Sequence, residues 1–466
     1  MSARRPFFVG LALLVSACSG PKYVRPETPT PPAFKEAANW TQARPSDEVS
    51  RGAWWDVLND PQLNALEARI DVSNNSLRAA QAQFDQARAY VRGAQAAQYP
   101  QVGGAGTIVN YDTSENRPLR NPSSATRYTD YLLRFDASYE VDVWGRVRSS
   151  VMASRAAAEA SAADLEVVRL SLHADLAANY LALRGLDAER AILLESVAAY
   201  ERALELTRNR YKGGVATGLD VAQAEAQLEA TRAQAIDIQA RRAQVEHAVA
   251  VLVGVPASTF AIEASPLAGD PPAIPPGIPA AVLERRPDIA AAERRMAAAN
   301  AQIGVARAAY FPAITLTGSA GFESAALLDW VRGASSFWTV APAAAMAIFD
   351  GGRRRAVSDQ AKAGYERTVA LYRETTLTAF REVEDQLATL RVLDEEAAVQ
   401  RAASDAAERV LVIATNRYKG GIATYLEVVV AQNAALTNRR ASVNILARRM
   451  TASVLLIKAL GGGWLP

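Results

Sequence analysis

The sequence predicts a mainly helical chain with a smaller β-sheet part, built by internal duplication. Residues 209–221 read NRYKGGVATGLDV and residues 416–428 read NRYKGGIATYLEV, so the thirteen positions differ in three places at an offset of 207. Two stretches of 67 residues, 145–211 and 352–418, have helical character and share that offset. Residues 131–143 instead alternate apolar and polar side chains, which is typical of a β-strand. Repetition on this scale indicates two copies of one structural unit.

The repeated segment predicts the tip of a helical hairpin. A glycine pair allows the left-handed backbone that ends a helix, and a threonine can cap the helix that follows. Each copy contains, in order, a tyrosine that ends one helix, the glycine pair, the threonine and the leucine that begins the next helix: Tyr211, Gly213, Gly214, Thr217 and Leu219 in the first copy, and Tyr418, Gly420, Gly421, Thr424 and Leu426 in the second. The simplest interpretation of the tips alone is two ordinary helical hairpins.

The N-terminus predicts an exported protein. Arg4 and Arg5 precede a short apolar stretch at 7–15, so residues 1–17 read as a signal peptide. Residues 15–18, VSAC, resemble a bacterial lipobox, which implies cleavage before Cys18 and acylation of its thiol, with palmitate among the expected chains. The alternative is an ordinary signal peptide followed by an incidental cysteine. Cys18 is the only cysteine, so no internal disulfide is expected.

The elements follow the same order in both halves. After a proline-rich tether at 18–61, the first repeat covers 62–264 and the second covers 286–466, joined by a proline-rich linker at 265–285. The first repeat is expected to contain a helix at 62–98, strands within about 101–143, the long helix, a tip at 212–218 and a helix at 219–253. The second is expected to contain a helix at 286–310, strands within about 313–348, the long helix, a tip at 419–425 and a helix at 426–460.

The strand at 131–143 has one apolar and one polar face. The apolar face is expected to carry Tyr131, Leu133, Phe135, Ala137, Tyr139, Val141 and Val143, and the polar face Arg134, Asp136, Ser138, Glu140 and Asp142. No later segment offers about 18 uncharged apolar residues for a spanning helix. Four strands cannot close a barrel, and an open edge is not tolerated in lipid, so subunits would have to associate. Two chains would reach the minimum of about eight strands, and three would give a wider lumen; a soluble sandwich is the alternative.

Several motifs together resemble the outer membrane factors, the TolC-like lipoprotein channels of tripartite efflux pumps. The motifs are the lipobox at Cys18, VDVWGR at 141–146, RRPDIAAAE at 285–293, IFDGGRRR at 348–355, the paired YKGG tips and KALGGGW at 458–464. The resemblance covers essentially the whole chain. It implies a trimer with a 12-stranded β-barrel in the outer membrane, continued by a long periplasmic α-helical barrel.

The resemblance also implies the function. It predicts a passive export conduit, gated at its periplasmic end and opened when a periplasmic adaptor and an inner-membrane pump dock, the pump being of the resistance-nodulation-division type. Two alternatives are a periplasmic adaptor lipoprotein and an exported enzyme. The sequence offers no catalytic set, and His173 and His247 are expected to be surface or packing residues rather than metal ligands. No cofactor is expected beyond lipid on Cys18, and the net charge of +2 gives no sign of a nucleic-acid partner.

By resemblance, two groups of residues carry this function. The tips that would dock on the adaptor are Gly214, Val215, Ala216, Thr217, Gly421, Ile422, Ala423 and Thr424. The periplasmic gate would comprise Asp220, Glu427, Leu426 and Tyr418. The alternatives are a plain turn for the tips and compensation of the helix dipole for the two acidic residues. Val430 and Ala423 depart from charged residues of the family, so apolar contact is expected to hold the gate more than ion pairing does.

Overall fold

A computed structural model describes Tyr23, Val24, Thr30, Lys35 and residues 52–119, 121, 123–272, 274 and 285–462. The predicted signal peptide, Cys18 and most of the tether and linker therefore lie outside the described residues. The chain forms two compact units: the first includes Gln83–Ala162 and Ala291–Tyr372, and the second includes Thr28–Ala82, Ala163–Ala290 and Arg373–Pro466. Each unit takes segments from both sequence repeats, so the repeats are not separate compact domains.

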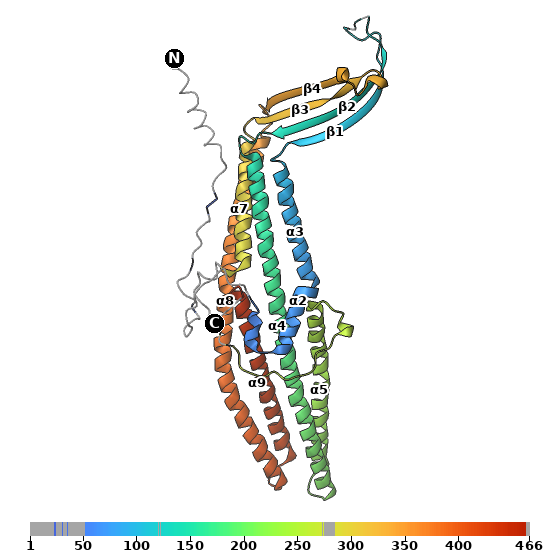
Figure 1. The fold of residues 1–466 in the computed structure, drawn as a ribbon. Helices are drawn as coiled ribbons and strands as arrows, with labels where there is room; N and C mark the ends of the chain where they lie inside the picture. Colours follow the sequence, from blue (N-terminus) through green and yellow to red (C-terminus); the bar gives the residue numbers. More distant parts are fainter. Residues whose placement is uncertain are drawn as a thin grey trace. The chain divides into compact units, whose positions relative to one another are not determined.

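The first unit contains one antiparallel sheet. Its strands are β1 (Gln101–Asp112), β2 (Arg127–Glu140), β3 (Ala313–Ser324) and β4 (Ser336–Ala345), paired in the order β1-β2-β3-β4 (Figure 1). β2 begins before and ends before the predicted 131–143. It ends early because Asp142 leaves the ladder to accept hydrogen bonds from the backbone N–H groups of Val147 and Arg148, at 3.0 and 2.8 Å, at the start of the next helix.

The register extends the row of Phe135 across all four strands. Phe135 lies opposite Gly104 on β1 and Ala320 on β3, and Ala320 lies opposite Trp338 on β4, so this row is apolar. The neighbouring row pairs Asp136 with Gly103 and Ser319 and is polar or small. The prediction of one apolar and one polar face is therefore confirmed within β2, whereas Val141 and Val143, which were expected on the apolar face, lie beyond the end of the strand. Large side chains on the apolar face are well exposed in the single chain, Trp338 at 75%.

The sheet is tied to the helices by the VDVWGR motif. The indole Nε1 of Trp144 donates to the backbone oxygen of Pro312 at 2.6 Å, and its ring stacks on Phe311 with centroids 4.7 Å apart. Arg146 pairs with Glu140 through its Nε at 2.7 Å. These contacts hold the connection between the end of β2 and the helix that begins at Arg146 against the start of β3.

The second unit contains the greater part of two helical hairpins, whose long helices begin in the first unit. The first joins α4 (Arg146–Lys212) to α5 (Gly218–Leu252), and the second joins α8 (Arg353–Lys419) to α9 (Tyr425–Ala459) (Figure 1). The two long helices have 67 residues each and the two return helices 35 each, so the duplication is preserved in length. Each helix lies within one residue of its predicted bounds. No helix among the described residues combines the length and apolar character needed to cross a membrane.

The predicted helix at 62–98 is wrong in one respect, because it is two helices. α2 (Pro61–Ser73) and α3 (Asn75–Ala96) are separated by Asn74, whose backbone is extended. The Asn74 side chain accepts from the N–H of Leu77 at 2.9 Å and donates to the carbonyl of Leu252 at 2.7 Å. One residue therefore caps α3 and attaches it to the end of α5, and this long-range contact breaks the helix.

In the sequence, a spacing of 4, 3, 4, 3 and 4 predicts a heptad seam on α4 that consists of Leu193, Val197, Tyr200, Leu204, Thr207 and Tyr211. Leu193, Tyr200, Leu204 and Thr207 are buried, as a 4-3 spacing requires. Tyr211, the last predicted member, is 54% exposed. The seam therefore ends one turn before the tip.

Two other motifs of the resemblance have structural roles. Arg286, at the entry to α7 (Pro287–Ala308), is buried and pairs with Asp288 and with Glu382 of α8, each at 2.7 Å. It also donates to the carbonyl of Ala459 at 2.9 Å. Gly461 has a φ of +93°, and a Cβ there would lie 3.0 Å from the carbonyl oxygen of Arg285. The RRPDI segment and Gly461 thus meet at the end of α9.

Candidate functional site: the hairpin tips

Both tips end their long helix in the same way. Gly214 and Gly421 have φ values of +75° and +74°, the left-handed conformation that glycine adopts without strain. In the first tip the N–H of Val215 donates to the carbonyl of Arg210 at 2.8 Å, and the N–H of Gly214 donates to Tyr211 at 2.9 Å. The same pair of bonds occurs 207 residues later. This pattern is a Schellman motif, so the sequence-based prediction of a glycine stop is confirmed.

The first return helix is capped as expected. The Thr217 hydroxyl accepts from the N–H of Asp220 at 3.2 Å, and the Asp220 carboxylate accepts from the N–H of Thr217 at 2.8 Å. These reciprocal bonds form a capping box, with Asp220 in the place usually taken by glutamate. Asp220 therefore stabilises the start of α5 whatever else it does.

The second return helix is not capped in this way, so the prediction for Thr424 is wrong. Thr424 occupies the N-cap position with extended backbone, but its side chain accepts no hydrogen bond. The equivalent acid, Glu427, is one methylene longer and points elsewhere: its carboxylate lies 3.7 Å from Nε of Arg417 on α8. The two copies thus use the same backbone turn with different side-chain contacts.

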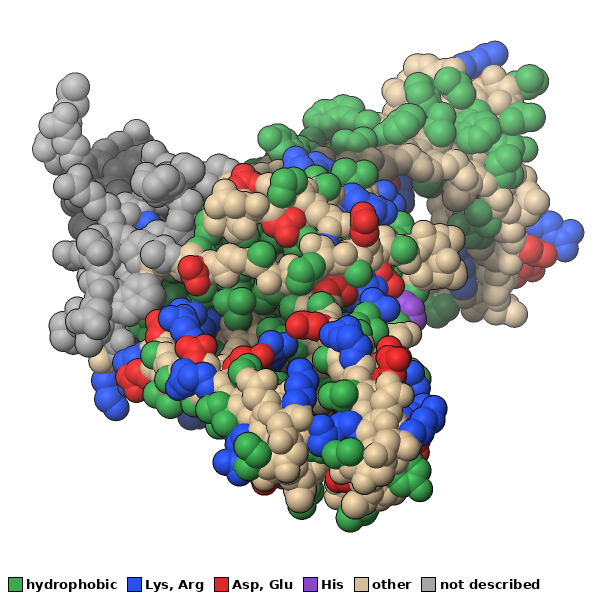
Figure 2. All heavy atoms as spheres, turned by 90° about the horizontal axis from the view of Figure 1, so that it is seen from below, with side chains coloured by type: hydrophobic (Ala, Val, Ile, Leu, Met, Phe, Trp, Pro, Cys, Tyr) green, Lys and Arg blue, Asp and Glu red, His purple; other side chains and the backbone are tan. Residues whose placement is uncertain are grey.

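The tips present apolar side chains to solvent. Val215 is 66% exposed and Ile422 is 74% exposed, at the same place in each turn. One position into each return helix, Leu219 and Leu426 are 67% and 53% exposed. Seen from below, acidic and basic side chains are scattered among hydrophobic ones over the helical part (Figure 2). Val215, Leu219, Ile422 and Leu426 are therefore accessible to a partner at the hairpin tips.

Tyr418 does not lie at the surface with the other three predicted gate residues. It is 5% exposed and belongs to a core cluster with Tyr200, Leu204 and Tyr425. Its ring meets Tyr425 edge-on at 5.2 Å, and its hydroxyl donates to Thr207 of α4 at 3.4 Å. Tyr418 thus joins the second hairpin to the first within one chain.

Arg210 is a contact residue that the sequence reasoning missed. Its guanidinium lies over the ring of Tyr418, 4.8 Å from the centroid, and donates to the carbonyl of Lys419 at 2.9 Å. It therefore neutralises the carbonyl end of α8 from the neighbouring hairpin. The signal was present, because Arg210 is the second residue of the repeated NRYKGG segment.

A second polar group lies far from the tips along the chain. His173 is buried, as the packing alternative for it expected, and its Nδ1 lies 2.7 Å from Oε2 of Glu67. Trp55 stacks on the imidazole at 4.4 Å. Burial raises the pKa of the Glu67 carboxyl to about 9, with a further rise from the charge of Asp71, and burial lowers the pKa of His173 to about 4. The pair is therefore neutral, a protonated carboxyl beside a neutral imidazole.

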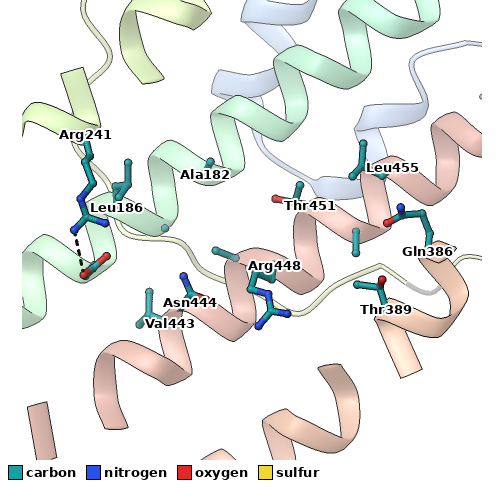
Figure 3. Close-up of a pocket in the computed structure, with 14 residues that line it drawn as sticks. Ala182, Leu186, Arg241, Gln386, Thr389, Val443, Asn444, Arg448, Thr451 and Leu455 are labelled. Atoms are coloured by element: carbon teal, nitrogen blue, oxygen red, sulfur yellow. Dashed lines mark ion pairs between the residues drawn. The ribbon is translucent and has the colours of Figure 1, made fainter. Parts of the chain in front are cut away.

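A hollow is also present among the four helices of the second unit. Figure 3 shows Ala182 and Leu186 on α4, Arg241 on α5, Gln386 on α8 and Thr451 on α9 around it. Arg241 is held at its edge by Glu189, with 3.6 Å between Nη2 and Oε1. Within the described part of the chain, no group of three or more His, Cys, Asp or Glu side chains is placed to hold a metal ion.

The four-stranded sheet, whose two outer edges have no partner strand among the described residues, and the doubled helical hairpin define a class, that of outer-membrane channel protomers. The family model described as "Outer membrane efflux protein" matches residues 59–255 and 278–462, one stretch in each repeat. The chain belongs to this family.

Individual relatives agree along the whole chain. Outer membrane protein OprJ of Pseudomonas aeruginosa is 34% identical over 470 residues, covering 99% of this chain and 97% of that protein. The cation efflux system protein CusC of Escherichia coli is 30% identical over 464 residues, covering 98% of each. Among solved structures, the Campylobacter jejuni CmeC outer membrane channel has a TM-score of 0.90 at 25% identity, over 96% of this chain and 95% of that one.

These findings confirm the predicted fold class and function. The protein is an outer membrane component of an efflux system, and the periplasmic adaptor alternative is not favoured. The family is one of export conduits rather than enzymes.

Proposed function

We propose that three copies of this chain form one continuous export channel. The observation that carries the proposal is the sheet: β1 and β4 each have one edge without a partner strand among the described residues, and the two faces differ in polarity. Three copies of four strands pair those edges into a closed barrel of twelve. The face of Phe135 and Trp338 then meets lipid, and the face of Arg134 and Asp136 lines water.

The periplasmic mouth is proposed to lie at the hairpin tips. Asp220 and Glu427 of three chains place two acidic rings there, with Leu426 as an apolar constriction. Leu426 is 53% exposed in the single chain, which leaves it available to meet its copies. Tyr418, whose hydroxyl already bonds Thr207 across the two hairpins, stabilises the closed arrangement.

Each tip is proposed to dock on the helical hairpins of a periplasmic adaptor. Exposed Val215 and Ile422 at equivalent turns supply apolar contacts, and the small residues beside them allow close approach. The inner-membrane pump is proposed to be of the resistance-nodulation-division type. Acylation of Cys18 is proposed to anchor each chain in the outer membrane, which mass spectrometry of the purified protein would test.

The channel proposal is tested on the full-length protein extracted from outer membranes in detergent. Light scattering should give the mass of three chains, and the trimer should migrate differently on gels before and after heating. In planar bilayers it should conduct ions. A detergent-soluble monomer without conductance would rule out the proposed channel.

A further inference from the structure

One face of α4, near the middle of the helix, is covered by other segments of the chain. The Tyr180 hydroxyl donates to Asp60, just before α2, at 2.6 Å, and the Arg184 guanidinium donates to a backbone carbonyl, that of Glu263, at 2.7 Å. Asp187 accepts a backbone N–H of the same segment, which follows α5, at 3.1 Å. Charged side chains thus bind the backbone of this segment and hold it against the helix.

The opposite face of α4 forms one wall of the hollow shown in Figure 3. Ala182, Leu186 and Glu189 line the hollow, and each lies two positions after one of the three residues of the covered face. Two positions turn an α-helix by about 200°, so these side chains point away from the covering segment. The hollow therefore opens on the uncovered face of the helix. Its volume is about 400 Å³, which is the size of a small-molecule site.

The wall of the hollow is largely apolar where α4 and α9 meet. A Cβ on Gly185 would lie 2.8 Å from that of Ala447, so the two helices are in close contact there. Leu186 of α4 and Leu455 of α9 also line the hollow. An apolar body of one or two rings would lose water-exposed surface on this wall.

The charged side chains that line the hollow are Arg241, Arg448 and Glu189. Glu189 is already bound by Arg440 of α9, whose Nε donates to Oε1 at 2.8 Å. Arg241 lies 3.6 Å from the same oxygen, beyond hydrogen-bond distance, and its second ion pair is with Asp237, which is 73% exposed. One lining carboxylate is thus shared by two guanidiniums.

Arg448 is also held loosely. Its Nη1 lies 3.7 Å from Glu396 of α8, and the two side chains are 54% and 45% exposed. Exposed ion pairs of this kind contribute little, so both arginines of the lining can turn to an incoming anion at small cost. A guanidinium binds planar anionic groups through paired N–H donors. The lining therefore combines surplus positive charge with an apolar wall.

We infer that the hollow binds small amphipathic anions, whose apolar body of one or two rings lies on the α4–α9 wall and whose anionic group reaches Arg241 or Arg448. The inference rests on the proposed channel in one respect, which is that the uncovered face of α4 lines the passage. The covering segment would obstruct a passage on its own side of the helix. Three copies then place three such sites around the conduit, as a station for anionic cargo.

A pair of photoreactive probes tests the site in the full-length protein in lipid nanodiscs. Azidonaphthalenesulfonate carries the anionic group, and azidonaphthalene has the same rings without it. After illumination, the modified peptides are identified by mass spectrometry. Arg241→Gln with Arg448→Gln removes both charges and leaves Glu189 bound to Arg440, so this double variant should fold. Arg88→Gln on α3 breaks one exposed ion pair and is the control.

The sulfonate should label peptides that line the hollow, at 182–189 or 443–455. Labelling there should fall about tenfold in the double variant, the effect of one hydrogen bond to a charged group, and should persist in Arg88→Gln. The neutral probe should label the same peptides weakly, and equally in both variants. Equal labelling by the two probes, or equal labelling of the wild type and the double variant, would overturn the inference.

Conductance in planar bilayers separates this inference from the proposed channel. Protein that conducts ions but is not labelled at the hollow would overturn the binding site and leave the channel standing. Protein that is labelled at the hollow but does not conduct would overturn the channel, and with it the station for cargo, and would leave the binding site standing.

Discussion

Glu67 and His173 share a hydrogen bond of 2.7 Å although 106 residues separate them in sequence. Both side chains are buried, and the carboxyl oxygen Oε1 of Glu67 has no hydrogen-bond partner in the described part of the chain. A buried carboxylate in that position would lack full compensation, so the neutral form is favoured. The pair joins α2 to α4 and holds Trp55 against the imidazole.

This pair makes stability depend on pH in a defined window. The pKa of Glu67 is raised to about 9, so its contribution is complete at low pH and is lost as pH rises from its ordinary value of 4.5 through 9. The pKa of His173 is lowered from 6.5 to about 4, so its contribution is present above 6.5 and lost as pH falls through 4. Between about 4.5 and 6.5 the proton differences cancel.

Stability should therefore fall between pH 6.5 and 9, with a limiting slope of about 1.4 kcal/mol per pH unit for one proton. Glu67→Gln keeps a neutral hydrogen-bonding side chain and should flatten that decline. Unfolding temperatures measured by circular dichroism across this range would check it. Glu229→Gln, at an exposed ion pair, is the control and should leave the decline unchanged. An equal decline in the Glu67 variant would exclude Glu67 as its source.

The two threonines at the tips should respond differently to substitution. Thr217→Ala removes a capping box and should destabilise α5 by about 1 kcal/mol. Thr424→Ala removes no capping hydrogen bond from its side chain, so it should destabilise α9 by at most a few tenths of the effect of Thr217→Ala on α5. The rates of hydrogen exchange at the first-turn amides of α5 and α9 report the local stability of each helix start, and they can be measured in each variant. Equal acceleration in the two variants would contradict the asymmetry.

Two glycines in the sheet offer a matched comparison. A Cβ on Gly321 would lie 2.0 Å from the backbone oxygen of Leu133 on the neighbouring strand, whereas nothing lies within 4 Å of one on Gly103. Gly321→Ala should therefore disrupt the β2–β3 pairing and reduce the fraction that assembles into a heat-modifiable oligomer. Gly103→Ala should assemble normally. Assembly of both variants to the same extent would show that the sheet can shift to accept the methyl group.

The acidic residues at the tips should set ion selectivity if they line the mouth. Asp220→Ala with Glu427→Ala should reduce cation preference and raise conductance in planar bilayers, because two rings of charge are removed. Asp220→Asn is the informative control, since an amide oxygen can still accept the N–H of Thr217 while the charge is lost. Unchanged conductance and selectivity in the double variant would remove both residues from the mouth.

Interactions between residues close in sequence determine the turns and the periodic elements of this fold, so these features can be predicted from the sequence. The glycine at the second position of each YKGG pair ends a helix because it alone adopts positive φ freely, so the Gly214 and Gly421 turns were predictable. The period-two alternation around Phe135 predicted a two-faced strand. The offset of 207 predicted two hairpins of equal length.

Contacts between segments distant in sequence were not predictable in this way. Asn74 broke a predicted helix because the end of α5 lies beside it. Glu427 forms an ion pair with Arg417 instead of a capping hydrogen bond, whereas Asp220 at the equivalent position caps its helix.

By itself, then, the sequence determined the periodic elements, the duplication and the family. Only the tertiary structure decided which copy of a repeated residue is buried and which copy is exposed. Tyr418 is buried under Arg210 while Tyr211 stays exposed, since identical residues in a duplicated chain have different neighbours. Helix and strand formation depend mainly on residues that are close in sequence. The burial of a side chain depends on which distant segment packs against it.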